Sequence, residues 1–437
     1  MKIALVLQPW DTAVPVVGGD TSIPILNHKL AKRLAEYHKV VIYSKDNGLR
    51  PETEYDEEGI KYRRIKCFVR DRLRKIVNML RRTSLGFTNP RRPFFASHIY
   101  YPEYGIKVAR DIRKEECDVV HIHNFTQYIP VIRAFNPKCR FVIHMHCEWL
   151  SQLDRAMMWR RVKKVDLILS CSEHVTDRIR QRFPVLADKC HTLFNGVDLE
   201  QFNSTSRLER ETHPTKKSLL FVGRISPEKG LHVLIKAFEE VVKRFPDAHL
   251  NLIGPKVNAP FDFIVPISDD KITSDLAKYY TKKAAVEVVR FEDEYYQILQ
   301  RVIPDSLTGK IIFHGSISHD ELLPYYRTAD IFILPSVWEE PYGIPVVEAM
   351  MARVPIVSTK SGGIKEVVQD GKTGFLVERD DSEEMGKAII SLLENNELSQ
   401  SLVEAAHERA ITKFSSEPVV QELIRYYNQY LPEKAKR

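Results

Sequence analysis

Two glutamates separated by seven residues, Glu340 and Glu348, lie where the sequence is best suited to bind a polar ligand. The apolar run 330–335 predicts a buried parallel strand, and Pro345 suits the first position of a following helix. A helix start after such a strand leaves backbone N–H groups unpaired, and these groups bind phosphate. Because carboxylates repel phosphate, we expect both glutamates to accept hydrogen bonds from sugar or ribose hydroxyls, as in a nucleotide-sugar site. The alternative is that Glu348 only complements the helix dipole and Glu340 is solvated.

Two cations follow an earlier strand of the same half. Arg224 comes directly after the apolar run 218–223, and Lys229 lies beside the next expected helix start. An arginine fork and a lysine point charge suit a diphosphate, so the two can converge on one anion. They could instead be two surface cations. We favour convergence because both residues are expected at strand ends in the sheet that also carries Glu340 and Glu348.

Histidines gather in two H-x-H pairs, His121/His123 and His144/His146. Alternation along a strand puts both rings of a pair on one face, and adjacent strands could combine them into a metal site. Neutral histidines at strand ends can also serve as hydrogen-bond partners of a ligand, which we favour. The sequence has no Asp-x-Asp pair to carry a cation to a diphosphate, so we expect no metal and no cofactor.

The elements that must position these residues alternate between strands and helices. In the first half, strands are expected at 3–7, 39–44, 119–123, 141–146 and 167–171. In the second half they are expected at 218–223, 249–254, 311–314, 330–334 and 355–358. Repeated units of this kind predict parallel sheets covered by helices. We therefore predict an α/β protein with two facing Rossmann-like domains, 1–195 and 196–414. A C-terminal helix at about 415–437 should cross back to the first domain, and ligands should bind between the domains beyond the strands' carboxyl ends.

A set of motifs spans nearly the whole chain: Gly18-Gly19, His121-Ile122-His123, Asn195-Gly196-Val197-Asp198, Gly223-Arg224 with Glu228-Lys229-Gly230, the Glu340/Glu348 pair, and 362–367. In this combination the sequence resembles the family 4 retaining glycosyltransferases of the GT-B fold. The resemblance implies a hexosyl transfer with retained configuration, from a nucleotide-diphosphate sugar to an acceptor hydroxyl. It implies a UDP-sugar as donor, and a polysaccharide, glycolipid or other cell-envelope glycoconjugate as product.

The resemblance also implies individual roles, which follow here in chain order. Gly19 lets substrates approach the first loop, and His123 touches the donor sugar. Gly223 belongs to the donor-binding set, and Arg224 and Lys229 neutralise the diphosphate. Glu340 accepts a hydrogen bond from the transferred sugar and Glu348 from the ribose, while backbone groups of Tyr342, Gly343 and Ile344 contact sugar or phosphate.

Some features leave alternatives open. Pro255 replaces the usual glycine-rich continuation, and the long segment 255–310 follows it, so the identity of the donor base is open. A nucleotide-sugar epimerase on the same architecture is the rival enzyme. A sugar-nucleotide-binding protein without activity is the non-enzymatic rival.

Charge is distributed unevenly. The chain has 437 residues and a net charge of +7, made up of +12 in residues 1–200 and −5 in the remainder. Much of the excess lies in 61–92, where Leu73, Ile76, Val77 and Leu80 fall at helical spacing among the cations. Such a stripe is typical of a helix that lies on an anionic membrane or meets a lipid-linked acceptor. An apolar stripe packed on its own domain, with a solvated basic face, is the alternative. No nucleic-acid-binding motif accompanies the charge.

The cysteines and the hydropathy of the sequence indicate the cellular compartment of the protein. The six cysteines contain no C-x-x-C pair, so we expect buried thiols in a reducing compartment. No apolar run has the length of a bilayer span. We expect a cytoplasmic protein with a peripheral position at the inner membrane face as an option.

Overall fold

The chain forms two units in the computed structural model. The structure describes residues 1–11, 13, 22–48, 50–67, 89–199, 202, 216–280 and 294–431. Unit 1 comprises Met1–Gly196 together with Ser416–Arg437, and unit 2 comprises Val197–Ser415. Gly19 and the apolar stripe at 73–80 lie outside the described residues.

Unit 1 is built on an eight-stranded sheet with the order β3-β4-β2-β1-β5-β6-β7-β8. Its strands are β1 (Lys2–Val6), β2 (Lys39–Lys45), β3 (Thr53–Tyr55), β4 (Lys61–Ile65), β5 (Val119–His123), β6 (Arg140–Met145), β7 (Leu167–Ser170) and β8 (Cys190–Thr192). All neighbours pair in parallel except β3 and β4. The central strands are almost fully buried because both faces of a parallel sheet are covered, and most of their residues are apolar apart from the histidines of β5 and β6.

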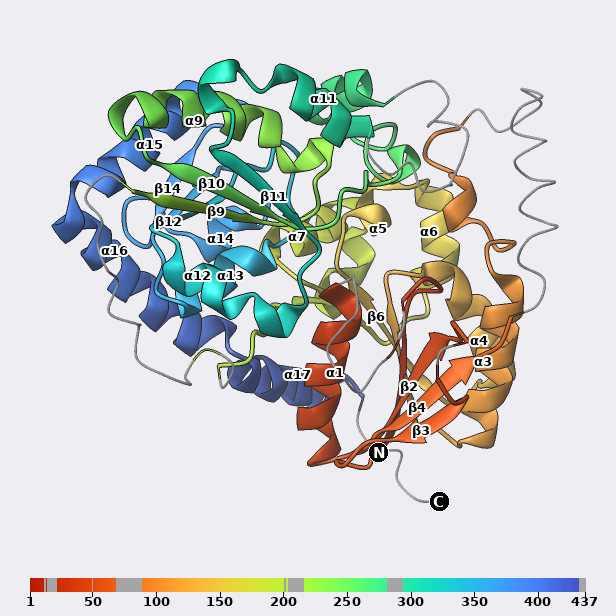
Figure 1. Cartoon of the computed structure of the whole chain (residues 1–437). Helices are drawn as coiled ribbons and strands as arrows, with labels where there is room; N and C mark the ends of the chain where they lie inside the picture. Colours follow the sequence, from red (N-terminus) through yellow and green to blue (C-terminus); the bar gives the residue numbers. More distant parts are fainter. Residues whose placement is uncertain are drawn as a thin grey trace. The chain divides into compact units, whose positions relative to one another are not determined.

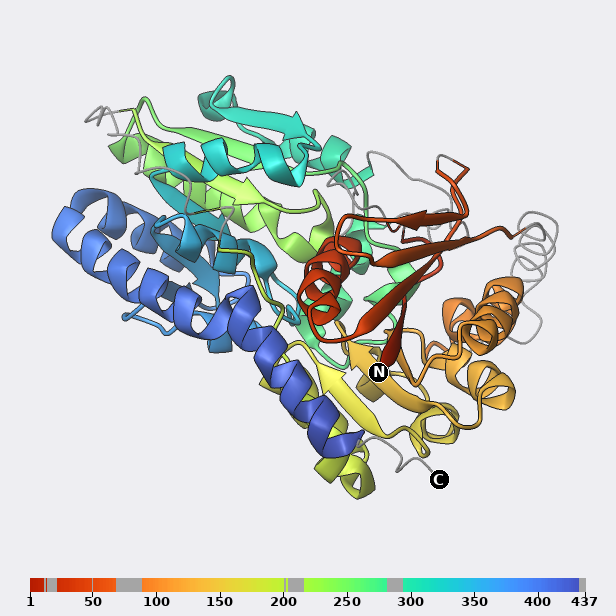
Figure 2. The same ribbon diagram turned by 90° about the horizontal axis from the view of Figure 1, so that it is seen from below.

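Helices cover this sheet: α1 (Ser22–Ala35), α3 (Pro102–Lys114), α4 (Ile129–Phe135), α5 (Trp149–Gln152), α6 (Arg155–Val162), α7 (Glu173–Arg182) and the C-terminal α17 (Ser416–Tyr430). Helix α17 lies beside α1, as Figures 1 and 2 show. Its residues Val419, Leu423 and Tyr427 belong to the same apolar core as Ile3 and Ile42. Among the described residues, no helix combines the length and apolarity needed to cross a membrane.

Part of the basic segment 61–92 has a structural role that composition does not reveal. Residues Lys61–Ile65 form strand β4. Their cations form ion pairs inside unit 1: Lys61 with Glu115, Arg63 with Asp111 and Arg64 with Glu54. This stretch is therefore not a free basic surface, and Arg92 at the other end of the segment also forms an ion pair, with Asp154.

Unit 2 is built on a parallel six-stranded sheet with the order β11-β10-β9-β12-β13-β14. Its strands are β9 (Ser218–Val222), β10 (His249–Ile253), β11 (Ile311–Gly315), β12 (Ile331–Leu334), β13 (Ile356–Thr359) and β14 (Phe375–Val377). The strand order reverses between β9 and β12, and in open α/β sheets such a switch point is where ligands bind. The loops after β9 and β12 carry the cations and glutamates that the sequence singled out.

Helices lie on both faces of the second sheet (Figure 1). They are α9 (Leu231–Arg244), α10 (Lys271–Asp275), α11 (Glu294–Val302), α12 (Leu323–Thr328), α13 (Ile344–Met351), α14 (Ile364–Val367), α15 (Ser382–Glu394) and α16 (Asn396–Arg409). The predicted fold class, α/β with two Rossmann-like parallel-sheet domains, is confirmed.

Candidate active site

The loops after β9 and β12 meet at the carboxyl edge of the second sheet. The two strands pair in parallel, with Phe332 opposite Leu220, so their loops leave the sheet side by side. The backbone N–H of Val337 donates to the carbonyl of Glu228 at 3.0 Å and ties the loops together. Gly230 allows this contact because it adopts φ +72°, and a Cβ there would lie 2.0 Å from the Pro335 carbonyl oxygen.

Lys229 and Glu340 form a buried ion pair across the two loops. The Lys229 Nζ lies 2.6 Å from Glu340 Oε2, and the Glu340 residue is only 7 % exposed. The same oxygen accepts hydrogen bonds from Ser336 Oγ at 3.0 Å and from Trp338 Nε1 at 2.9 Å. Burial raises the pKa of Glu340, but Lys229 and these donors outweigh burial and hold the pKa below its usual value. Glu340 is therefore an ionised, oriented carboxylate and not a solvated one.

Arg224 is oriented by a carboxylate that sequence reasoning gave no role. Its Nη2 lies 3.0 Å from Glu228 Oε1, and Ser226 Oγ donates to the same oxygen at 2.5 Å. Glu228 is fully buried, whereas the Arg224 side chain remains 39 % exposed. Glu228 therefore fixes the orientation of the guanidinium, while the exposed part of the Arg224 side chain can bind an anion. Its signal in the sequence was the i, i+4 spacing of Arg224 and Glu228.

Glu348 lies on the inner side of α13, buried between two donors. Its Oε1 lies 2.7 Å from His319 Nε2, and its Oε2 accepts from the Tyr326 hydroxyl at 2.8 Å. Burial raises the pKa of Tyr326, with the neighbouring Glu348 carboxylate adding to the effect, so the tyrosine stays a donor. The first turn of α13 contains no acidic residue, so complementing the helix dipole does not explain Glu348.

The start of α13 lies one residue before the predicted position, so that Pro345 is the second residue of the helix and not the first. Gly343 adopts φ +87° at the N-cap, and the helix begins at Ile344 with Pro345 in its first turn. Tyr342 is buried beside Phe414, with ring centroids 6.2 Å apart. Gly223, directly after β9, precedes Arg224 on the opposite loop. The structure therefore brings the loop that carries Gly223, Arg224 and Lys229 to the loop that carries Glu340 and Tyr342–Ile344.

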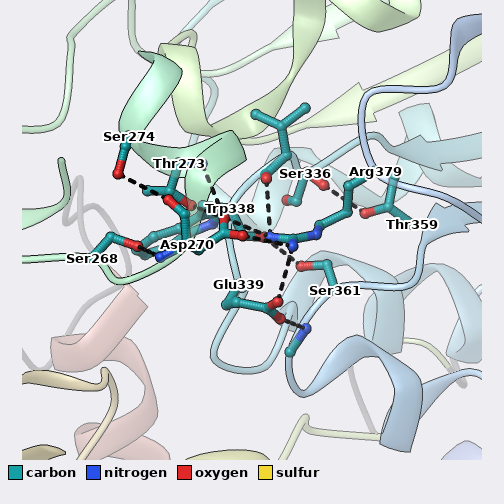
Figure 3. Close-up of polar contacts among 12 residues, drawn as sticks. Ser268, Asp270, Thr273, Ser274, Ser336, Trp338, Glu339, Thr359, Ser361 and Arg379 are labelled. Atoms are coloured by element: carbon teal, nitrogen blue, oxygen red, sulfur yellow. Dashed lines mark hydrogen bonds and ion pairs between the residues drawn. The ribbon is translucent and has the colours of Figure 1, made fainter. Parts of the chain in front are cut away.

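A second set of ion pairs and hydrogen bonds fixes the loop before α13, which carries Glu339 and Glu340 (Figure 3). Arg379 forms a two-point ion pair with Asp270, with both N–O distances 3.0 Å, and lies 3.2 Å from Glu339 Oε1. Glu339 Oε2 in turn accepts from the Gly362 N–H at 2.5 Å. Ser361 receives the N–H of Glu340 at 2.8 Å. The loop before α13 is therefore fixed at several consecutive residues.

Asp270 belongs to the segment 255–310, which follows the missing glycine-rich continuation. Because Arg379 pairs with both Asp270 and Glu339, it connects this segment to the loop before α13. Tyr280 of the same segment lies close to Arg224 and Glu228. Burial raises its pKa, with smaller effects of Glu228 and Arg224. Its hydroxyl is buried and has no hydrogen-bond partner among the described residues. Part of the 255–310 segment thus contributes a polar group to the candidate site, which sequence reasoning did not anticipate.

His123 ends strand β5 in unit 1. It is 1 % exposed, and its Nδ1 lies 2.9 Å from His146 Nε2. The two H-x-H pairs do place their rings together, with centroids 4.7 Å apart for His121 and His123 and 4.2 Å apart for His144 and His146. A pocket in unit 1 is lined in part by His123, His144 and His146.

The two parallel-sheet units have the architecture of the GT-B glycosyltransferases. Residues 204–409 match the family described as "Glycosyl transferases group 1", and residues 25–201 match "Glycosyltransferase Family 4". The chain belongs to the family 4 glycosyltransferases.

Similar proteins include spore coat protein SA of Bacillus subtilis, 24 % identical over 98 % of this chain and all of that protein. A lipopolysaccharide 1,2-N-acetylglucosaminetransferase of Salmonella typhimurium is 26 % identical over 74 % of this chain and 75 % of its own length. Among solved structures, sucrose-phosphate synthase from Thermosynechococcus elongatus has a TM-score of 0.73 at 17 % identity, covering 99 % of both chains. Anabaena Alr3699/HepE in complex with UDP and glucose has a TM-score of 0.65 at 18 % identity, covering 97 % of this chain and 98 % of that one.

Proposed function

We propose that this glycosyltransferase moves a hexosyl group from a UDP-sugar to an acceptor hydroxyl with retention of configuration and without a metal ion. The acceptor is expected to belong to a polysaccharide, a glycolipid or another cell-envelope glycoconjugate. One observation carries the proposal: Lys229 and Glu340 form a buried pair at the switch point, with Arg224 held nearby by Glu228. Structural neighbours that bind UDP or UDP-glucose support the choice of base.

The residues suggest how the transfer proceeds. The bond between the anomeric carbon and the diphosphate oxygen breaks while the acceptor oxygen bonds to the same face of that carbon. The proton of the acceptor hydroxyl passes to the departing phosphate. Arg224, Lys229 and the N–H groups at the start of α13 stabilise the negative charge that develops on the leaving group, and such stabilisation is usually the largest catalytic effect. Glu340 Oε2 is occupied by three side-chain donors, so its Oε1 is the atom assigned to a sugar hydroxyl.

A donor screen tests the proposal. UDP-sugars and other sugar nucleotides are incubated with a chelator present, with and without glycan and lipid acceptors, and nucleotide release is measured. The expected result is release of a nucleoside diphosphate that depends on the acceptor and survives chelation. An isomerised sugar nucleotide without acceptor would identify the epimerase instead. Binding without either product would indicate a non-catalytic protein.

Glu348→Gln is expected to weaken nucleotide binding by about tenfold, because a charge-assisted hydrogen bond to the ribose is roughly twice as strong as a neutral one. Calorimetry with UDP measures the effect. Glu397→Gln, on the first turn of α16 in the same unit, is the control and should bind UDP as the wild type does. Equal affinity of all three proteins would remove Glu348 from the nucleotide site.

The basic segment beyond β4 is proposed to contact an anionic membrane or a lipid-linked acceptor. Described cations at both ends of the segment pair inside unit 1, among them Lys61, Arg63, Arg64, Lys66 and Arg92. The proposal therefore rests on the sequence between them. Each cation near an anionic surface can add about 1 kcal/mol, and the gain falls as salt rises. Sedimentation with anionic vesicles should therefore succeed at low salt and weaken for Arg74→Glu/Lys75→Glu. Equal binding to neutral vesicles, or none to either kind, would contradict it.

A further inference from the structure

We propose that unit 1 contains a binding site for a transition-metal ion of the zinc class, formed by His121, His123 and His144. In the sheet, His123 of β5 pairs directly with His144 of β6. His121 precedes His123 by two residues and therefore projects from the same face. One nitrogen from each of the three rings can be chosen so that all of them lie within 4.8 Å of one another.

Hydrogen bonds determine which nitrogen atoms are available. The amide oxygen of Asn195 can only accept, so His146 Nδ1, 3.1 Å away, carries the proton and donates. His146 Nε2 then has a lone pair and accepts from His123 Nδ1 at 2.9 Å. This relay leaves a lone pair on His123 Nε2. On the neighbouring ring, His121 Nδ1 lies 2.6 Å from the Tyr427 hydroxyl, which leaves His121 Nε2 as the remaining nitrogen.

The remaining nitrogens are buried. Nε2 of His121 and Nε2 of His123 have no hydrogen-bond partner among the described residues. The His144 ring interacts with the backbone of Leu193, but neither of its nitrogens forms a hydrogen bond of good geometry. Buried polar atoms normally have a partner, so the facing nitrogens of the three rings call for an explanation. A single metal ion would satisfy one nitrogen of each ring at once. Tyr427 and the His146–Asn195 relay would act as the outer partners that orient metal-bound imidazoles.

The donor set indicates the kind of ion. Imidazole nitrogens suit zinc, copper, nickel and cobalt, whereas magnesium and calcium prefer oxygen ligands. Tetrahedral bonds of 2.0–2.1 Å would place the nitrogens roughly 3.4 Å apart, so the rings must close slightly. A pocket of the same unit is lined in part by His123, His144 and His146, next to the proposed site.

This site is separate from the chemistry assigned to unit 2. Arg224 and Lys229 provide the positive charge for the diphosphate, so transfer does not require the ion. If the proposed function holds, His123 also meets the donor sugar, and a bound ion would then inhibit transfer by occupying His123 Nε2. Metal binding is therefore tested by direct binding and not by activity.

Cobalt binding to the full-length protein tests the site. After chelator treatment and its removal, Co²⁺ is titrated and the visible absorption is recorded, since tetrahedral cobalt absorbs far more strongly than octahedral cobalt. The wild type should bind one equivalent with a tetrahedral spectrum, and Zn²⁺ should displace the cobalt. Zn²⁺ should also raise the thermal midpoint as its concentration increases. A wild type without a stoichiometric tetrahedral spectrum overturns the proposal without recourse to any variant.

Variants locate the ion. His144→Asn should bind Co²⁺ at least tenfold more weakly, and His123→Gln serves as a second variant if His144→Asn does not fold, as judged by circular dichroism. His98→Asn, an exposed histidine of the same unit, is the control and should bind as the wild type does. Undiminished binding by a folded His144→Asn or His123→Gln would place the ion elsewhere and contradict the proposal.

Discussion

Replacing Lys229 by alanine is expected to lower kcat by about 10²-fold or more, with a smaller change in KM. The loss of one preorganised donor to a developing oxyanion costs about 10²–10³ in kcat in other enzymes. Lys229 should bind the departing diphosphate more strongly than the intact donor, so its removal affects the transition state more than the ground state. Arg224→Ala should behave similarly, although Arg224 is more exposed than Lys229 and its effect should be smaller.

Controls separate catalysis from folding. Lys229→Ala also leaves the buried Glu340 carboxylate without its cation, and breaking a buried pair in this way costs about 3–5 kcal/mol of stability. Lys229→Ala combined with Glu340→Gln removes that charge, so a kcat that stays low in a stable double variant supports the catalytic assignment. Lys243→Ala, whose side chain is 70 % exposed, should keep wild-type kinetics. A loss confined to KM, with kcat unchanged, would contradict the role given to Lys229.

Gly230→Ala is expected to destabilise unit 2 by about 3 kcal/mol or more and to disturb Lys229 beside it. The residue has φ +72°, which disfavours any side chain, and the new Cβ would lie 2.0 Å from the Pro335 carbonyl oxygen. Left-handed strain alone costs roughly 1–2 kcal/mol, and overlap with backbone adds to it. The loops after β9 and β12 must then separate, which moves Lys229 away from Glu340.

Gly309 serves as a control that separates backbone strain from the steric clash with Pro335. Gly309 has φ +77°, but a Cβ there would meet nothing within 4 Å. Gly309→Ala therefore carries the same backbone strain without the collision. Thermal unfolding should show a drop of roughly 6–12 °C or more for Gly230→Ala and about 2–8 °C for Gly309→Ala, given 2–4 °C per kcal/mol. Equal drops and equal kcat for the two variants would show that the contact with Pro335 has no role.

The fold could be predicted from the sequence because its main strands are buried on both faces. Continuous apolar runs such as Ile331–Leu334 stand out from their surroundings, and all four residues of β12 are buried. The short strands β3, β8 and β14 were not predicted, since three residues give no periodic pattern. Strand β4, with the sequence KYRRI, was interpreted only as part of a basic segment. Two of its cations, Lys61 and Arg63, are paired with acids about 50 residues away, Glu115 and Asp111, which no local pattern reveals.

The sequence could predict those site residues that directly follow a strand, because the end of a strand fixes their place at the sheet edge. The spacing after β9 and β12 predicted that Lys229 and the glutamates would share one sheet edge. The partners of Glu348, His319 and Tyr326, come from other elements, and so does the Arg379–Asp270 pair. Such contacts depend on three-dimensional packing, so sequence spacing could not supply them.

Proton NMR of a complete reaction tests the central claim most directly. The donor found by the screen is mixed with its acceptor and the wild-type protein, and the anomeric signals of donor and product are followed together with the released nucleotide. The account predicts that a donor with an α-linked sugar gives an α-linked product, with one nucleoside diphosphate released for each bond formed. A β-linked first product, or a sugar nucleotide that is isomerised without release of nucleotide, would contradict it.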